Sequence, residues 1–122
     1  MILLDTNILI EVLRGSDLAD RLEKMDENFA ISAVTEMELY FGARDKRELR
    51  RIMKFLAGFE IIHLDEPVSR RATELIAEYA KSHRLAIPDA LIAATALIHN
   101  LPLLTLNKKD FRYIEGIELI KI

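Results

Sequence analysis

Short apolar runs alternate with stretches of helical apolar spacing along nearly the whole chain, and no other feature limits the possible fold as strongly. The runs are too short for helices and stop at polar residues, which is typical of strands buried on both faces. They predict strands at Ile2–Leu4, Phe29–Ile31, Ile61–Leu64 and Leu103–Leu106, and an edge strand at Ile117–Ile120.

Between these runs, apolar residues recur at steps of three and four, the period of a helix with one buried face. Ser32 can cap a helix that ends near Gly42, and Pro88 suits the first turn of an apolar, central helix that reaches about His99. The other predicted helices are 7–13, 18–25, 49–59 and 68–79, with one further turn at 108–113.

Strands that alternate with helices predict an α/β fold built on a parallel sheet. Parallel neighbours need a crossover connection, and the helices of these crossovers cover both faces of the sheet. The chain has 122 residues and 51% hydrophobic content, enough for one core, since domains usually contain about 100 to 150 residues. We therefore expect a single domain over residues 1–122.

Composition narrows the classes of function. With a net charge of -3 the protein is not generally basic, so a surface that binds nucleic acid would have to be local. The lack of cysteine rules out disulfides and thiolate metal sites and is compatible with a reducing cytoplasm, where we expect the protein. The N-terminal run reaches Asp5 too soon for a secretory signal, and no apolar stretch approaches the roughly 20 residues of a membrane-spanning helix.

Acidic and polar residues follow the predicted strands. In open α/β sheets ligands bind outside the carboxyl ends of the strands, so these positions are candidates for a site. They are Asp5 after the first strand, Glu36 and Glu38 after the second, Asp65 and Glu66 after the third, and Asn107 and Asp110 after the fourth, joined by Asp89 at a helix start.

Carboxylates gathered at one edge of a sheet repel each other, by about 4 kcal/mol per pair at 4 Å and an effective dielectric near 20. Protonation or a divalent cation relieves this repulsion. Oxygen ligands favour Mg²⁺ or Mn²⁺, and Ca²⁺ is less favoured because the sequence contains no EF-hand loop.

Each acid also has a structural interpretation. Asp5 can cap the helix that follows it, and Asp89 can interact with the dipole at a helix start. Asp65 precedes Glu66 and Pro67 and is most simply a helix cap. Glu36 and Glu38 point in different directions on a helix, so only one of them can face the site.

Other chemistries find little support in the sequence. His63, His83 and His99 have no spacing typical of metal ligands and are interpreted as structural. The sequence contains no Gly-rich phosphate loop and no nucleophile elbow. A phosphatase with Asp5 as nucleophile would carry a second Asp two residues on, where Asn7 stands.

Four segments together resemble, in order and spacing, the PIN domains of VapC-type toxins. They are Leu4-Asp5-Thr6-Asn7, Ser32-Ala33-Val34-Thr35-Glu36-Met37-Glu38-Leu39, Pro88-Asp89-Ala90-Leu91-Ile92-Ala93-Ala94-Thr95-Ala96 and Leu104-Thr105-Leu106-Asn107-Lys108-Lys109-Asp110-Phe111. The resemblance implies a three-layer α/β/α sandwich around a parallel sheet of four to five strands in the order 3-2-1-4-5. It further implies an endoribonuclease that cleaves RNA through water activated by Mg²⁺ or Mn²⁺, a homodimer, and an antitoxin protein as partner.

The resemblance also assigns residues. Asp5, Glu38 and Asp89 match the family's core acids and metal ligands, which selects Glu38 over Glu36. Thr6, Asn7 and Thr105 match polar supports. The fourth acidic position departs from the pattern, because Asn107 stands there and Asp110 follows shortly after. An amide adds no negative charge, so the affinity for a second metal depends on which of the two residues fills the role.

RNA at an acidic site needs basic side chains nearby to neutralise its phosphates. Lys108, Lys109 and Arg112 flank the predicted site, while Lys46, Arg47, Arg50, Arg51 and Lys54 lie on the polar face of one helix, where a solvated face is the simpler interpretation. A PIN-fold RNA-binding module with weak or no catalysis is the alternative function, and Asn107 is its best argument.

Overall fold

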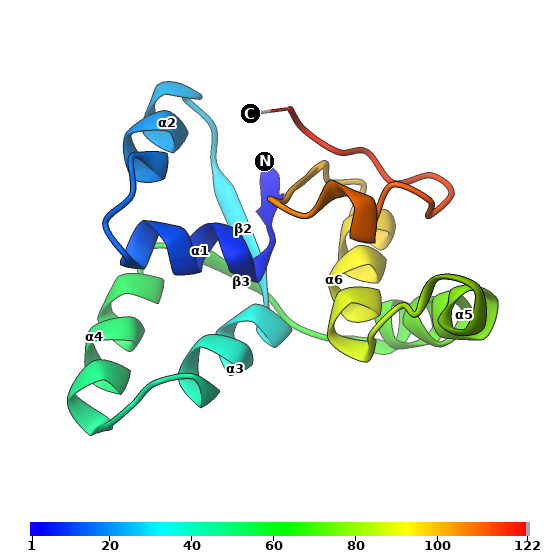
Figure 1. The fold of residues 1–122 in the computed structure, drawn as a ribbon, viewed down its shortest axis with the longest axis horizontal. Coiled ribbons are helices and arrows are strands. Elements are labelled where there is room, and N and C mark those ends of the chain that lie inside the picture. The colour runs from blue at the N-terminus through cyan, green and yellow to red at the C-terminus, as the bar shows by residue number, and fades with distance from the viewer. Residues whose placement is uncertain (122) are drawn as a thin grey trace.

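A computed structural model describes residues 1–121 of the chain. Its centre is a parallel sheet in the order β3-β2-β1-β4 (Figure 1). The strands are β1 (Ile2–Leu4), β2 (Phe29–Ser32), β3 (Glu60–Ile62) and β4 (Leu103–Leu104). The α/β fold with a parallel sheet, predicted from the alternating pattern, is confirmed.

Six α-helices and one short 3-10 helix connect and cover the strands within the described residues. They are α1 (Thr6–Leu13), α2 (Leu18–Lys24), α3 (Ala33–Phe41), α4 (Lys46–Leu56), α5 (Glu66–His83), α6 (Ile87–Ile98) and η1 (Lys108–Asp110). The predicted caps form, since Ser32 Oγ accepts a hydrogen bond from the Val34 N–H at 3.1 Å and Asp65 Oδ1 accepts one from the Val68 N–H at 3.0 Å. Asp65 is therefore a helix cap, as its sequence context predicts.

Neighbouring residues of one strand pack into two different cores, because side chains alternate between the faces of a sheet. Leu3 of β1 packs with α5 and α6, whereas Ile2 and Leu4 pack with α1, α2 and α4. Ala30 and Ile31 of β2 divide between the two cores in the same way. The result is three layers with helices on both sides of the sheet (Figure 1), as expected.

Three predicted strands are shorter than expected. β3 covers Glu60–Ile62, so it begins one residue before and ends two residues before the predicted Ile61–Leu64. β4 stops at Leu104 because Thr105 and the backbone of Leu106 bind side chains of the N-terminal segment instead of continuing the ladder. The expected edge strand at Ile117–Ile120 contributes a single bridge, between Leu103 and Leu119. The predicted turn of helix at 108–113 is shorter too, with only Lys108–Asp110 in the 3-10 helix.

α6 is the central helix that its apolar sequence predicts. Its residues 92–96 are all buried, as is Ala90. Two apolar residues of α3 behave differently, since Met37 and Phe41 are 58% and 93% exposed. Among the described residues, none of the helices is long and apolar enough to cross a membrane.

Candidate active site

Asp5 lies at the point where the sheet changes direction. From β1 the chain proceeds to β2 and β3 on one side, and it returns to β4 on the other side of β1. The backbone N–H of Asp5 donates to the Leu104 carbonyl at 2.9 Å, so the carboxyl ends of β1 and β4 are joined here. A crevice at such a switch point is where α/β proteins bind ligands.

Both carboxylate oxygens of Asp5 are held by the protein. Oδ1 accepts the Thr6 N–H at 2.8 Å, and Oδ2 accepts the Thr105 hydroxyl at 2.7 Å. Asp5 is only 5% exposed, and burial raises the pKa of its carboxyl more than these two hydrogen bonds lower it, while the charges of Glu38 and Asp110 raise it further. Asp5 is thus the N-cap of α1 and a buried acid with a fixed orientation.

Thr105 is the centre of the polar support beside Asp5. Its hydroxyl accepts the backbone N–H of Asn107 at 3.0 Å and the Asn7 side-chain amide at 3.4 Å. The Asn7 amide oxygen in turn accepts the Leu106 N–H at 3.3 Å. Asn7 and Thr105 therefore join the start of α1 to the segment after β4.

A chain of hydroxyl groups orients Glu38. The Thr6 hydroxyl donates to Glu38 Oε1 at 2.7 Å and lies 2.9 Å from the Thr35 hydroxyl. Because the Thr6 proton is used for Glu38, the Thr35 hydroxyl must donate to Thr6. Thr35 is fully buried, and it is not among the site residues predicted from the sequence. Its position three residues before Glu38 in the matched segment was the only indication of this role.

Glu36 and Glu38 diverge, as their spacing predicts. Glu36 accepts the Tyr40 hydroxyl at 2.9 Å along its own helix. Burial raises the pKa of Tyr40, and the hydrogen bond to Glu36 raises it further. Glu38 instead reaches Thr6 on α1. The structure therefore brings Glu38, and not Glu36, to Asp5.

Asp89, in the first turn of α6, completes the acidic group. Burial raises its pKa to about 6, and the charges of Asp5, Asp110 and Glu38 contribute to this increase. Four carboxylates from different parts of the chain, Asp5, Glu38, Asp89 and Asp110, are thus close enough to repel one another. Within residues 1–121 none of the four forms an ion pair.

Asn107 and Asp110 occupy different positions. Asn107 is exposed and reaches the site through its backbone N–H to Thr105. Asp110 acts electrostatically on Asp5 and Asp89 and lines the same cavity as Asp89. The negative charge of the segment after β4 therefore comes from Asp110.

The three basic candidates after β4 are placed differently. Lys109 lines a cavity together with Asp89 and Asp110. Lys108 is half-buried at the start of η1, and Arg112 is exposed beyond its end. Basic charge is thus available beside the acids, but no described lysine or arginine is paired with them.

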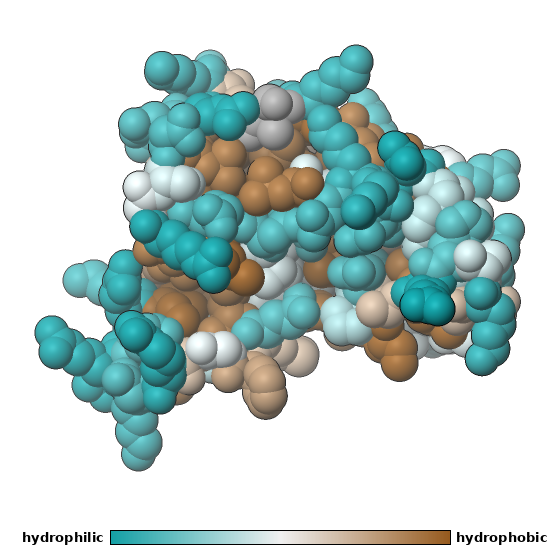
Figure 2. All heavy atoms as spheres, viewed as in Figure 1, coloured by the Kyte–Doolittle hydropathy of each residue, from teal (hydrophilic) through white to brown (hydrophobic). Residues whose placement is uncertain are grey.

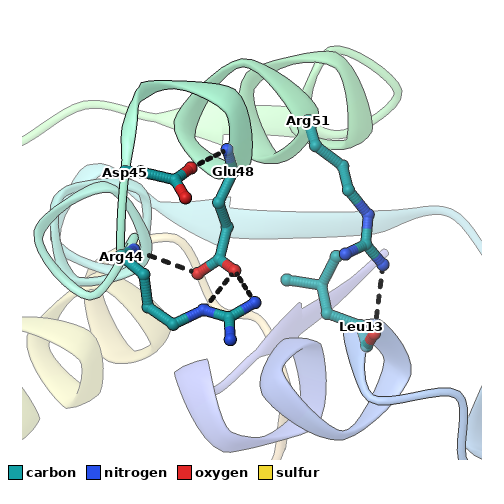
Figure 3. Close-up of polar contacts among 5 residues, drawn as sticks. All are labelled: Leu13, Arg44, Asp45, Glu48 and Arg51. Carbon is teal, nitrogen blue, oxygen red and sulfur yellow. Dashed lines mark hydrogen bonds and ion pairs between the residues drawn. The ribbon is translucent and has the colours of Figure 1, made fainter.

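A separate groove of about 560 Å³ lies between α1, α3 and α4, and Glu38 is the one acid of the group that reaches it. Figure 3 shows the polar contacts of this groove: Arg44 binds Glu48 through its backbone and guanidinium, and Arg51 donates to the Leu13 carbonyl at 3.4 Å. Arg44 and Arg51, two basic residues of this groove, therefore bind groups of the protein itself.

The oxygen donors at the sheet edge suit a hard divalent cation, because an anionic, partly buried oxygen cluster is stabilised by such an ion. Their arrangement limits how the ion could be held. Within residues 1–121, no three Asp, Glu or His side chains are close enough together to hold a metal ion without other ligands. A set of one or two carboxylates completed by waters or substrate oxygens fits both observations.

Known proteins share this fold and sequence pattern. A sequence model of the PIN domain family matches residues 2–117. Ribonuclease VapC10 of Mycobacterium tuberculosis is 39% identical, over 97% of this chain and 91% of its own length. A toxin-antitoxin complex from Klebsiella pneumoniae aligns over 100% of both chains with 36% identity and a TM-score of 0.81. VapBC2 from Rickettsia felis, bound to a DNA fragment from its promoter, aligns over 98% of both chains with 30% identity and a TM-score of 0.83.

Proposed function

This chain belongs to the PIN domain family, and from that premise we propose that it is a metal-dependent endoribonuclease and the toxin of a toxin-antitoxin pair. One observation carries the proposal: four carboxylates meet at the carboxyl edge of a parallel sheet with no basic side chain of residues 1–121 paired to them. The ribonuclease relative and the toxin-antitoxin complexes with the same fold support the choice of reaction and setting.

The cofactor we propose is Mg²⁺ or Mn²⁺, with Asp5 and Asp89 as direct ligands. These two acids are the ones whose pKa is raised, so a cation relieves their repulsion most. Mg²⁺ commonly uses one or two carboxylates and fills its remaining positions with waters and substrate phosphates. Glu38 and Asp110 would then act on the ion through water.

When bound, the cation would supply Lewis acidity, lowering the pKa of the attacking water and neutralising charge on the phosphate. The protein contributes orientation: Thr105 and the Thr6 N–H fix both oxygens of Asp5. Glu38 Oε1 accepts the Thr6 proton, which leaves Oε2 to take a proton from the attacking water. Thr35 keeps the Thr6 hydroxyl pointed at Glu38.

Asp110, rather than Asn107, fills the fourth acidic role in this proposal. Its charge acts on both Asp5 and Asp89, whereas Asn107 contributes a backbone N–H that helps to hold Thr105. An acid at this position also weakens the case for the alternative function, an RNA-binding module that lost catalysis. Titration of metal against a folded-state probe separates the two, since the module without catalysis needs no metal.

The direct test is cleavage of structured and unstructured RNAs with Mn²⁺ or Mg²⁺ by the wild type and by Asp89→Asn. We expect cleavage that depends on the metal and is lost in the variant, while the circular dichroism spectrum is unchanged. Full activity in excess EDTA would contradict the proposal.

For RNA binding we propose Lys108, Lys109 and Arg112 as the basic residues that neutralise phosphates. A single-stranded RNA loses affinity with salt in proportion to the phosphates neutralised, with a slope of about -0.7 per contact. Lys108→Ala should flatten that slope by about one contact. An unchanged slope would show that Lys108 is an ordinary surface residue.

A cognate antitoxin and a second copy of the chain are the proposed protein partners. Expression should arrest growth, and co-expression of the partner should relieve the arrest.

For the dimer, the exposed apolar side chains Met37, Phe41 and Ile87 offer a contact surface on α3 and at the start of α6. Figure 2 shows hydrophobic surface at the lower edge of the molecule, below these two helices. Sedimentation of wild type and Phe41→Glu tests this, and a monomeric wild type would contradict it.

A further inference from the structure

Three aromatic side chains form a cluster beside the acids. The rings of His83 and Tyr113 are stacked, with centroids 4.0 Å apart and planes at 12°. Tyr79, one helical turn before His83 on α5, meets both rings edge-on at 5.7 Å and 5.0 Å. Tyr79 and Tyr113 are half-buried and His83 is exposed, so the stack presents the imidazole to solvent.

The stack and two of the acids line one cavity. This cavity, of about 220 Å³, is lined by His83, Arg84, Leu85, Asp89, Lys109, Asp110 and Tyr113. Burial raises the pKa of Tyr113, and the charges of Asp89 and Asp110 in the same cavity raise it further. The aromatic stack is therefore a wall of the same space that the proposed catalytic acids face.

Two basic residues of this cavity are available to a ligand. Arg84 follows the last turn of α5 with a left-handed backbone, φ 56°, and this turn buries Leu85 while Arg84 stays exposed. Within residues 1–121, Arg84 and Lys109 form no ion pair, although Arg70 and Arg71 in the first turns of α5 do. Asp89 and Asp110, the nearest acids, are left unneutralised by them.

An aromatic platform and free basic groups in one small cavity match the base and the phosphate of a nucleotide. Single-stranded RNA is bound by stacking its bases on aromatic rings, including histidine, and by placing its phosphates against Lys and Arg. Cavities that enclose a whole small ligand usually measure about 300 to 1,000 Å³. This one is smaller, so it would hold one nucleotide of a strand in part and leave the rest of that nucleotide outside.

We propose that this cavity binds the nucleotide next to the cleaved bond of a single-stranded RNA segment, with its base stacked on the exposed ring of His83 and its phosphate contacted by Arg84 and Lys109. The inference rests on the proposed ribonuclease function and extends it: the enzyme would act on an unpaired nucleotide, because a paired base cannot leave its duplex stack without cost. His83 is then a binding residue, in addition to packing on Tyr113.

The test is a double-mutant cycle between the protein and the RNA. A short single-stranded RNA is titrated in EDTA with an abasic nucleotide placed at each position in turn, against wild type, His83→Ala and His83→Phe. We expect one position where loss of the base weakens wild-type binding about tenfold, the effect of one stacked base. His83→Ala should lose affinity for the intact RNA similarly. The His83→Ala variant should lose no further affinity when the RNA is abasic at that position. His83→Phe should retain the stacking.

Matched controls come from the chain itself. His99→Ala changes an exposed histidine at the opposite end of α6 from Asp89 and should bind like wild type. Arg84→Gln should reduce the salt slope by about one phosphate contact, whereas Arg70→Gln, on the first turns of α5, should not.

Each outcome is decisive. Equal affinities of His83→Ala and wild type, or losses that add at every position, would overturn the inference alone. A wild type that neither cleaves nor binds single-stranded RNA would overturn the proposed function and the inference with it. Cleavage by a wild type insensitive to abasic nucleotides would leave the function standing and remove only the stacking site.

Discussion

The carboxylates of Asp5 and Asp89 at the sheet edge differ in their surroundings from the carboxylate of Glu48, which lines the groove between α1, α3 and α4. Glu48 receives the Arg44 backbone N–H and two guanidinium nitrogens, at 3.2, 2.9 and 2.7 Å, and the hydrogen bonds from Arg44 lower the pKa of Glu48. Among the described residues, neither Asp5 nor Asp89 has such a basic partner, and burial raises the pKa of both. Figure 3 shows the Arg44 guanidinium directed at the Glu48 carboxylate.

This difference shows that the charge at the sheet edge is left for something outside the chain to neutralise. Basic residues are abundant on α4 and near β4, yet within residues 1–121 none pairs with the four acids. A buried carboxylate without a basic partner is costly, and such groups are typical of functional sites. The following predictions test the contrast, beginning with the largest effect.

Asp5→Asn should lower RNA cleavage by about a thousandfold while the protein remains folded. A metal contributes several kcal/mol to the transition state, and each 1.36 kcal/mol is a factor of ten. Asn can cap α1 in place of Asp, so the fold should survive. Glu48→Gln is the matched control from the groove and should retain full kcat. Initial rates of RNA cleavage measure both variants. An equal loss of rate in Asp5→Asn and Glu48→Gln would remove the distinction between the two regions.

Thr105→Val should weaken metal binding by about 10- to 100-fold, the usual effect of removing a group that orients a metal ligand. Its hydroxyl holds Asp5 Oδ2, and without it the Asp5 carboxylate loses a hydrogen bond to its charged form. Titration of Mn²⁺ against cleavage rate measures the change. Thr105→Ser keeps the hydroxyl and should restore the wild-type midpoint; a failure to do so would point to packing as the cause.

The metal-free protein should lose stability through Asp89 as the pH rises. The folded-state pKa of about 6 lies above the ordinary value of 3.8, so the folded protein binds this proton more tightly than the unfolded chain. The contribution is complete below about pH 4 and is lost as the pH passes through about 6. In urea denaturation with EDTA, the free energy of unfolding of Asp89→Asn should therefore increase relative to that of the wild type between pH 4 and 7. A constant difference would contradict the pKa, and added Mn²⁺ should reverse the gain.

Arg44→Gln should produce the smallest effect. Arg44 is exposed, and surface ion pairs contribute little because water screens them. The thermal midpoint and the cleavage rate should both stay within measurement error of the wild type. A clear fall in cleavage, with the midpoint unchanged, would show that the groove takes part in catalysis through Glu38.

The sequence predicts most of the fold because the information is local. The first strand, Ile2–Leu4, agrees residue for residue, and the caps at Ser32 and Asp65 follow from side chains that bind their own helix. The end of β4 could not be predicted, since Thr105 leaves the ladder for Asp5, a partner 100 positions away.

The site shows the same division between local and distant information. The acids are recognisable from their positions after strands, and the proximity of Asp5, Glu38 and Asp89 that the resemblance implied is present in the structure. Thr35 and the stack of His83 on Tyr113 could not be derived, because each depends on a residue about thirty positions away. The interpretation of His83 as structural missed its exposure and its place in the cavity.

The hydrogen bond between Thr105 and Asp5 has a consequence for synthesis of the protein. Ribosomes add about 5 to 20 residues per second, and Asp5 is made long before Thr105 and Asp110. Until those residues leave the ribosome, β1 has no β4 beside it and Asp5 has no Thr105 to hold its second oxygen. A nascent chain therefore emerges beside ribosomal RNA without a finished site, and it completes that site only after β4, Thr105 and Asp110 have been made.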